Sequence, residues 1–423
     1  MYTPFIIKKY LNKTLVKKNA KMKKGGLTNF FENFLKKESI FKDKASLQYN
    51  FFPDTILHRE EEIEQIAGVL APTLRAEKPS NLFLYGKTGT GKTLVVKHVT
   101  AQLSKLAKER NLPITVAYLN CKLKRVADTE YRLIAQIARE FGQEVPATGL
   151  PTDEVYKIFI DSLNSKKQIL VLILDEIDQL VKKIGDEVLY NLTRLSSEFK
   201  NVEIVIIGIS NNLVFVDNLD PRVKSSLSEE EFLFNPYNAL QLQDILRQRA
   251  KLAFKKDALE EGVIEKCAAY AARDHGDARR ALELLRVAAE LAERKNNQKI
   301  AITHLDLAEE KIERDRVIDI LRTQPKQFQL TLYAIILSSY KSESNIFTGE
   351  IYETYKENCS KIGLKPLTQR RVSDIIAELD MLGVITTKII SKGRYGRTRE
   401  IRLAIPSSTK PEVQAILKDG LNL

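Results

Sequence analysis

The chain has 423 residues, too many for one hydrophobic core, and its 43% hydrophobic and 29% charged residues are typical of a folded globular protein. No apolar run reaches the roughly 20 residues of a membrane-spanning helix, and three widely spaced cysteines without a CxxC pair argue against a disulfide framework or a zinc site. A net charge of +12 favours a polyanionic partner.

The first 28 residues are predicted to form a mobile basic tail, because residues 1–26 contain eight lysines and no acidic residue. Contact with nucleic acid and a merely solvated end are both open interpretations of this tail. Residues 29–237 are predicted to be an α/β domain, since five apolar segments alternate with helical ones and therefore indicate a parallel sheet. The expected strands are 82–85, 114–120, 169–174, 202–209 and 232–234.

Two further domains are predicted after the sheet. Residues 238–316 carry amphipathic helical segments without a strand signal, which indicates a small helical domain. Residues 317–423 show three helical segments, a strand, a basic turn with glycines and a second strand, the order of an α+β winged-helix domain. The expected helices are 240–255, 260–274, 277–293, 303–314, 330–340, 347–360 and 368–382, and the expected strands are 384–390 and 398–404.

The first predicted strand leads directly into a complete GxxxxGK[ST] motif, which a helix follows. The glycines allow successive backbone N–H groups to point at phosphate oxygens, at the positive end of the helix. Lys92 is expected to reach the β- and γ-phosphates of ATP, and the Thr93 hydroxyl to bind Mg²⁺. This context favours a phosphate-binding loop (P-loop) over an ordinary glycine-rich turn. The motif comprises Gly86, Lys87, Thr88, Gly89, Thr90, Gly91, Lys92 and Thr93.

Polar residues follow two of the later predicted strands. Asp175 and Glu176 come directly after residues 169–174, and Asn211 follows residues 202–209. Carboxyl ends of parallel strands meet at the edge where α/β sheets bind ligands, so these residues are expected beside the P-loop. Asp175 is expected to hold Mg²⁺, Glu176 to orient the attacking water, and Asn211 to contact the γ-phosphate. A turn asparagine is the alternative for Asn211.

These elements, followed by a helical domain containing Gly276-Asp277-Ala278-Arg279, resemble the AAA+ proteins. The resemblance implies that the helical domain is a lid from which Arg279 reaches the γ-phosphate. A surface arginine at a helix start is the alternative. It also implies that Arg222 is an arginine finger, reaching a nucleotide on a neighbouring subunit. Eukaryotic relatives often carry a second arginine four residues later, where this chain has Ser226.

More particular stretches, over roughly residues 53–404, resemble the archaeal initiators of the origin-recognition-complex type. Residues 56–63 are similar to the segment that lines the adenine pocket in that family, and the tripeptide 235–237 fits the same family. The resemblance therefore implies a further set of nucleotide-binding residues: Ile56, Leu57, His58, Arg59 and Tyr237.

Positive charge concentrates in the predicted winged-helix domain, where residues 361–405 contain ten Lys or Arg and four Asp or Glu. The helix 368–382 is expected to enter the major groove of DNA with its polar N-terminal end, and the turn 392–397 to form the wing tip. Docking of a protein partner is the alternative use of this domain. The candidate DNA-binding residues are Thr368, Gln369, Arg370, Arg371, Ser373, Lys392, Arg394, Tyr395 and Arg397.

The resemblance implies a weak ATPase that uses ATP, ADP and Mg²⁺ as a switch. Its expected function is replication initiation: binding double-stranded origin DNA and helping to recruit the replicative helicase, with paralogous initiator subunits as further partners. We expect a cytoplasmic, nucleoid-associated protein without a membrane partner. A clamp-loader subunit is one alternative, although such a subunit usually ends in a helical collar. An NTP-dependent transcription regulator or a protein-interaction ATPase is another.

Overall fold

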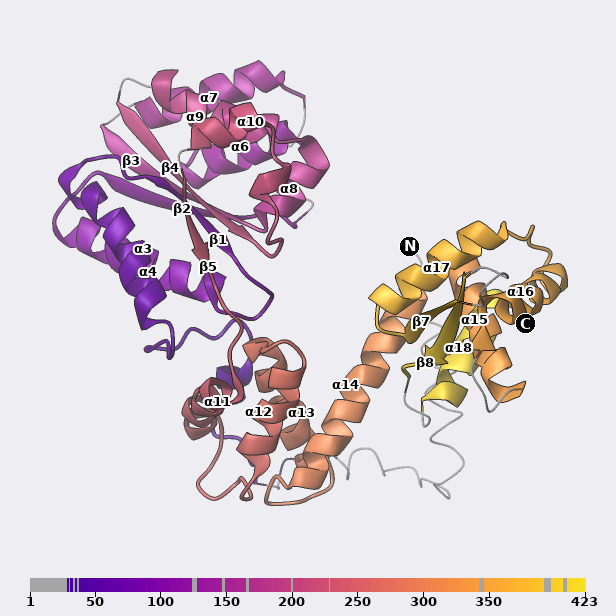
Figure 1. Ribbon diagram of the computed structural model, residues 1–423. Helices are drawn as coiled ribbons and strands as arrows, with labels where there is room; N and C mark the ends of the chain where they lie inside the picture. The colour runs from indigo at the N-terminus through magenta and orange to yellow at the C-terminus, as the bar shows by residue number, and fades with distance from the viewer. Residues whose placement is uncertain are drawn as a thin grey trace.

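A computed structural model describes residues 29, 31–32, 35 and 38–423, except for 124–127, 147–148, 165–166, 199–200, 228, 342–345, 392–396 and 406–408. Three bodies follow one another along the chain: a sheet domain, a helical domain and a smaller mixed domain (Figure 1). The predicted fold class, an α/β P-loop domain with a helical lid and a C-terminal winged helix, is confirmed. In the parts of the chain described, no helix is both long and apolar enough to cross a bilayer.

The sheet has five parallel strands in the order β2-β3-β4-β1-β5. The first four coincide with predicted strands, because strands buried on both faces read as continuous apolar runs. β5 begins three residues earlier than expected. It lies at the edge of the sheet, and because it begins with three consecutive glutamates, its sequence does not read as an apolar run. The strands are β1 (Asn81–Tyr85), β2 (Ile114–Asn120), β3 (Gln168–Asp175), β4 (Val202–Ser210) and β5 (Glu229–Leu233).

Side chains alternate between the two faces of this sheet, and each face has its own core. Leu82 and Leu84 pack with the helices before β2, whereas Phe83 packs with the later helices on the opposite face. The two helical layers are visible on either side of the strands (Figure 1). On one face lie α3 (Glu60–Leu70) and α4 (Lys92–Glu109), and on the other α6 (Glu130–Glu140), α7 (Thr152–Asn164), α8 (Ile177–Ile184), α9 (Glu187–Glu198) and α10 (Pro221–Leu227).

The helical domain, called the lid below, takes part of its core from the N-terminal side of the sheet domain. Ile40 and Leu47 are buried among lid side chains. Main-chain hydrogen bonds fix this segment, since Lys42 N donates to Ala253 O at 2.7 Å and Lys255 N donates to Ile40 O at 3.0 Å. The lid helices are α11 (Ala239–Ala253), α12 (Val263–Arg273), α13 (Ala278–Arg294) and α14 (Ile302–Thr323).

The last lid helix is nine residues longer at its C-terminal end than the predicted 303–314, and it crosses residue 316, where we placed a domain boundary. Leu305 and Ala308 near its start belong to the lid core, whereas Val317 and Leu321 near its end belong to the core of the next domain. The intervening stretch is almost entirely charged and lacks an apolar stripe. One uninterrupted helix therefore joins the lid to the winged-helix domain (Figure 1).

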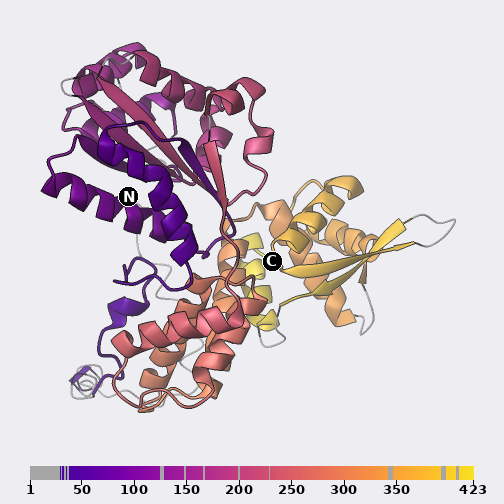
Figure 2. The same cartoon turned by 60° about the vertical axis from the view of Figure 1, so that its left-hand side comes forward.

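The C-terminal domain has the predicted three helices and hairpin. Figure 2 shows the hairpin of β7 and β8 projecting from this domain. Two elements escaped prediction: β6, a two-residue strand that completes an antiparallel sheet in the order β6-β8-β7, and α18, which packs against α15. The elements are α15 (Lys326–Lys341), β6 (Ile346–Phe347), α16 (Thr348–Lys361), α17 (Gln369–Met381), β7 (Ile385–Ser391), β8 (Arg397–Leu403) and α18 (Lys410–Leu421).

We predict that Leu47→Ala destabilises the lid, because it removes a side chain that is 2% exposed from the lid core. The expected cost is about 2–5 kcal/mol in free energy of unfolding. Hydrogen exchange of peptides from α11 to α13 measures this cost locally. Gln48→Ala, at the exposed neighbouring position, is the control and should leave exchange unchanged. Equal exchange in both variants would show that this segment does not support the lid.

Candidate nucleotide site and nucleic-acid surface

The P-loop connects the end of β1 to the start of α4 and is crossed by the lid. Gly89 adopts a φ of 72° and lies so close to Asp277 that an added Cβ would stand 1.7 Å from Asp277 Oδ1. Ala278 N, at the start of α13, donates to Gly89 O at 3.2 Å. The lid therefore touches the phosphate loop directly, and only glycine fits at this position.

Lys92 is folded back over the P-loop. Its Nζ donates to Gly86 O at 2.7 Å, to Lys87 O at 2.8 Å and to Asn211 Oδ1 at 3.0 Å. Burial, followed by the positive charge of Arg279, lowers the pKa of Lys92 to about 8. The structure thus brings Asn211 beside Lys92, at the end of β4. Phosphate oxygens are stronger acceptors for this ammonium group than the carbonyl oxygens that now hold it.

Asp175 lies at the carboxyl end of β3, beside Thr93. Its Oδ2 accepts from Thr93 Oγ1 at 3.1 Å and from Tyr118 OH at 2.7 Å, while Oδ1 accepts from Glu176 N at 3.0 Å. Burial and the contact with Asp175 raise the pKa of Tyr118, so its hydroxyl stays a donor. Hydroxyl and carboxylate oxygens suit a hard cation such as Mg²⁺. Glu176 has a left-handed φ of 56°, and its carboxylate lies 3.7 Å from Lys122 Nζ.

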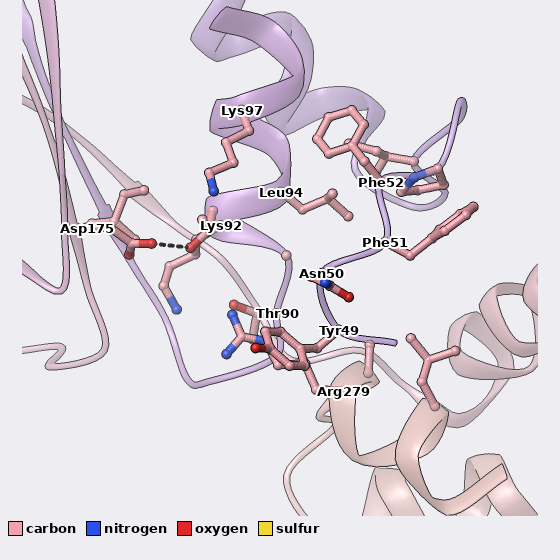
Figure 3. A pocket seen from close by; sticks show the side chains of 18 of the residues that line it. Tyr49, Asn50, Phe51, Phe52, Thr90, Lys92, Leu94, Lys97, Asp175 and Arg279 are labelled. Carbon is pink, nitrogen blue, oxygen red and sulfur yellow. Dashed lines mark hydrogen bonds between the residues drawn. The ribbon is translucent and has the colours of Figure 1, made fainter. Parts of the chain in front are cut away.

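A cavity of about 620 Å³ opens between the P-loop, the segment before α3 and the lid. Figure 3 shows Asp175 at one side of this cavity and Phe51 and Phe52 at the other. A single pocket thus has a charged end at the P-loop and an aromatic end at the preceding segment. Of the residues predicted to contact nucleotide, those lining it are Ile56, Leu57, Gly89, Thr90, Gly91, Lys92, Thr93, Asp175, Glu176, Asn211, Tyr237 and Arg279.

Other predicted nucleotide residues lie behind or beside the pocket wall. Arg59 is buried, its Nε donates to Thr90 O at 2.9 Å, and its guanidinium lies 4.1 Å from the ring centre of Tyr237. His58 Nε2 lies 3.0 Å from Asp244 Oδ2 of α11. These two residues position the loop and the lid. Gly86, Lys87 and Thr88 begin the P-loop, outside the lining.

Several lining residues could not be predicted from the sequence. No motif predicts Tyr118, because its hydroxyl reaches Asp175 only once β2 and β3 pair in the sheet. Tyr49, Phe51 and Phe52 lie on the aromatic segment before residue 53, seen in Figure 3. Arg249 of α11 lies against Phe51, far away in the chain. The aromatic residues before residue 53 were the one sequence feature that could have indicated this part of the pocket.

The two candidate arginines of the ATPase mechanism occupy different places. Arg279, in the first turn of α13, lines the cavity, and its backbone N donates to Asp277 Oδ1 at 2.7 Å. Arg222 lies on α10 outside the lining, with 84% of its side chain exposed and its Nε 3.1 Å from Asp220 Oδ1. Arg279 thus lies in the cavity wall, whereas the side chain of Arg222 is mostly exposed to solvent.

The helix α17 presents a polar N-terminal turn to solvent. Thr368 caps it by accepting a hydrogen bond from Arg371 N, and Gln369, Arg370 and Arg371 are exposed. Ser373 is half-buried, and its carbonyl accepts from Arg399 Nη1 of β8 at 3.1 Å. Val372, Ile376 and Leu379 of the same helix are buried.

The predicted wing-tip residues Lys392, Arg394 and Tyr395 lie outside the described residues. Arg397 is the first residue of β8, opposite Ser391 of β7, and its side chain is not described.

All three domains match models or relatives of one protein family. Family models match residues 75–214 (AAA domain), 243–310 (Cdc6 AAA+ ATPase-type lid domain) and 319–410 (CDC6, C-terminal winged helix domain). The ORC1-type DNA replication protein of Pyrococcus abyssi is 52% identical over 90% of this chain and 91% of its own length. The chain belongs to the ORC1-type DNA replication proteins.

Other relatives of this ORC1-type chain agree. The ORC1-type DNA replication protein 1 of Methanosarcina acetivorans is 49% identical over 91% of this chain and 92% of its own. A solved structure of the Aeropyrum pernix ORC1 protein in complex with DNA has 44% identity and a TM-score of 0.77, covering 90% of this chain and 98% of that one. The resemblance to archaeal origin-recognition initiators is confirmed, and a winged helix in place of a collar disfavours the clamp-loader alternative.

We predict that ATP affinity of this ORC1-type chain falls as pH rises above about 8. Lys92 is then deprotonated in the free protein, whereas bound phosphate restores its proton and so raises its pKa. The expected loss approaches tenfold per pH unit above this point. Titration calorimetry between pH 7 and 9.5, in two buffers of different ionisation enthalpy, measures the affinity and the proton uptake. A flat affinity without proton uptake would contradict the role of this lysine.

Proposed function

We propose that this chain is an ATP-regulated replication initiator that binds double-stranded origin DNA and helps to recruit the replicative helicase. One observation carries the proposal: a single helix, α14, connects the lid of the P-loop pocket to a basic winged-helix domain. A protein built this way can make its DNA-binding surface depend on the bound nucleotide. We also place it in the cytoplasm, associated with the nucleoid.

In this proposal each pocket residue has its own role in binding or hydrolysing ATP with Mg²⁺. Lys92 neutralises the β- and γ-phosphates, and Thr93 and Asp175 would hold Mg²⁺, which would supply further positive charge against the phosphates. Their support is that the ammonium and the two oxygen ligands meet at one sheet edge. Glu176, next in the chain after Asp175, orients the attacking water, and Asn211 contacts the γ-phosphate.

Two arginines then connect the pocket to conformational change and to assembly. Arg279 senses the γ-phosphate from the lid, which its place in the cavity wall supports. Arg222 is the finger that completes the pocket of a neighbouring, paralogous subunit, which its exposure supports. Hydrolysis is slow and works as a switch, since a finger supplied by another chain leaves the isolated pocket incomplete.

The DNA contacts are assigned to the winged helix. The exposed turn Gln369–Arg371 of α17 enters the major groove, with Thr368 and Ser373 at its edge, while the wing residues Lys392, Arg394, Tyr395 and Arg397 reach phosphates or the minor groove. The closely similar Aeropyrum pernix ORC1 protein has been solved in complex with DNA, which supports this assignment over docking of a protein.

The ATPase part is tested by two substitutions. Lys92→Ala should lose most ATP affinity, because it removes the buried cation of the P-loop. Glu176→Gln should bind ATP normally but hydrolyse it at least roughly a hundredfold more slowly, since the water loses its positioning group. Calorimetry and phosphate release measure the two effects. The control is Glu203→Gln, near the amino end of β4 and so at the opposite end of the strands from the pocket. Wild-type turnover by Glu176→Gln would remove this residue from the mechanism.

The DNA part is tested by removing charge from α17. The double variant Arg370→Ala/Arg371→Ala should lose affinity for a footprinted origin duplex more than for random duplex, by about 1–3 kcal/mol per bidentate contact with guanine. The control Lys105→Ala/Lys108→Ala removes two exposed charges from α4. Fluorescence anisotropy on both duplexes at several salt concentrations, with ATP and with ADP, gives the comparison. Equal losses on both duplexes would indicate phosphate contact without sequence readout.

A further inference from the structure

An arginine of the lid is buried at the aromatic end of the nucleotide cavity. Arg249 is 5% exposed, its Nη2 donates to Phe51 O at 3.3 Å, and its guanidinium lies 4.5 Å from the ring centre of Phe51. Burial lowers the pKa of Arg249 to about 10, so the group remains charged at neutral pH. Its Nη1 has no hydrogen-bond partner among the described residues.

An unpaired donor on a buried charge is unfavourable, because its hydration is lost and nothing replaces it. Three other described residues carry such an unpartnered buried atom, Tyr85, Arg314 and Thr409, and none of them lines this cavity. Arg249 does line it. Among the described residues that line this cavity, Arg249 is thus the only one with such an atom, and a ligand bound in the cavity can supply the missing acceptor.

The surroundings of Arg249 favour a flat heterocycle as this ligand group. Cationic and acidic residues of the P-loop and β3 gather at the other end of the cavity (Figure 3). The neighbouring polar group on α11 is already engaged, since Gln248 Nε2 donates to Thr55 O at 3.1 Å. Phe51 and Phe52 stand at the aromatic end (Figure 3), and the cavity is also lined by the apolar residues Ile56, Ile245 and Leu282.

We propose that Arg249 reads the base of the nucleotide by donating a hydrogen bond from Nη1 to an unprotonated ring nitrogen of the purine. Adenine offers N1, N3 and N7 as such acceptors, and an arginine has donors only, so it recognises an acceptor edge and not the exocyclic amine. Arg249 thus fixes the orientation of the base while the P-loop holds the phosphates. This inference rests on the proposed binding of ATP.

The test uses three ATP analogues, each with one ring nitrogen replaced by carbon: 1-deaza-, 3-deaza- and 7-deaza-ATP. The full-length wild type should bind one of the three at least roughly tenfold more weakly than ATP, because a charged donor loses its acceptor. Arg249→Met, which keeps the length of the apolar stem, should bind ATP and that same analogue with equal affinity. Calorimetry supplies the dissociation constants.

A control and a second variant distinguish recognition of the base by Arg249 from a purely structural role of this side chain. Arg247→Met removes an exposed guanidinium from the same helix, where it pairs with Asp244 and Glu265, and should keep the wild-type pattern. Arg249→Lys keeps the charge without the planar group and should lose most of the discrimination. Tripolyphosphate, which has no base, should bind to wild type and to Arg249→Met alike, showing that the phosphate end is intact.

Two results would overturn the inference. The first is a wild type that binds all three analogues like ATP, a result that does not depend on any variant. The second is an Arg249→Met protein that binds ATP and every analogue more weakly by one common factor, because the arginine would then only tie the aromatic segment to the lid. Failure of the wild type to bind ATP at all would instead refute the proposed function.

Discussion

The structure depends on one buried cation, Arg59, at the junction of the sheet domain and the lid. Its Nε donates to Thr90 O of the P-loop, its Nη2 donates to Asn235 O at 2.6 Å, and its Nη1 pairs with Glu62 at 2.7 Å. The ring of Tyr237 covers the guanidinium. A single side chain thus fixes the start of α3, the P-loop and the connection from β5 to the lid. Because this charge is 4% exposed, every one of its partners is needed to offset its lost hydration.

From this junction, contacts run without a break to α17. Gly89 meets the first turn of α13, and the same turn holds Arg280, which forms ion pairs with Glu309 at 2.9 Å and Glu313 at 2.6 Å on α14. Further along α14, Arg316 Nη2 donates to Leu382 O, just beyond the end of α17. The P-loop and α17 are therefore linked through elements that are held together by hydrogen bonds and ion pairs.

The sequence was sufficient for those parts of the molecule that local pattern determines. The P-loop motif and four of the buried strands were predicted, because their apolar runs and glycine spacing have few alternatives. What could not be predicted depends on long-range contact. The neighbours of Arg249 and the hydroxyl of Tyr118 become part of the pocket only after folding. The length of α14 was missed for a different reason: both of its ends are buried in different cores, and the charged middle carries no periodic signal.

The continuity of α14 makes it a lever. Its 22 residues form a rod about 33 Å long, embedded at one end in the lid and at the other in the winged-helix domain. A tilt of roughly 10° at the lid would move the far end by about 6 Å, close to two steps of roughly 3.4 Å along a DNA strand. A lid rotation of this size would thus be enough to move α17 out of register with the bases that we propose it contacts.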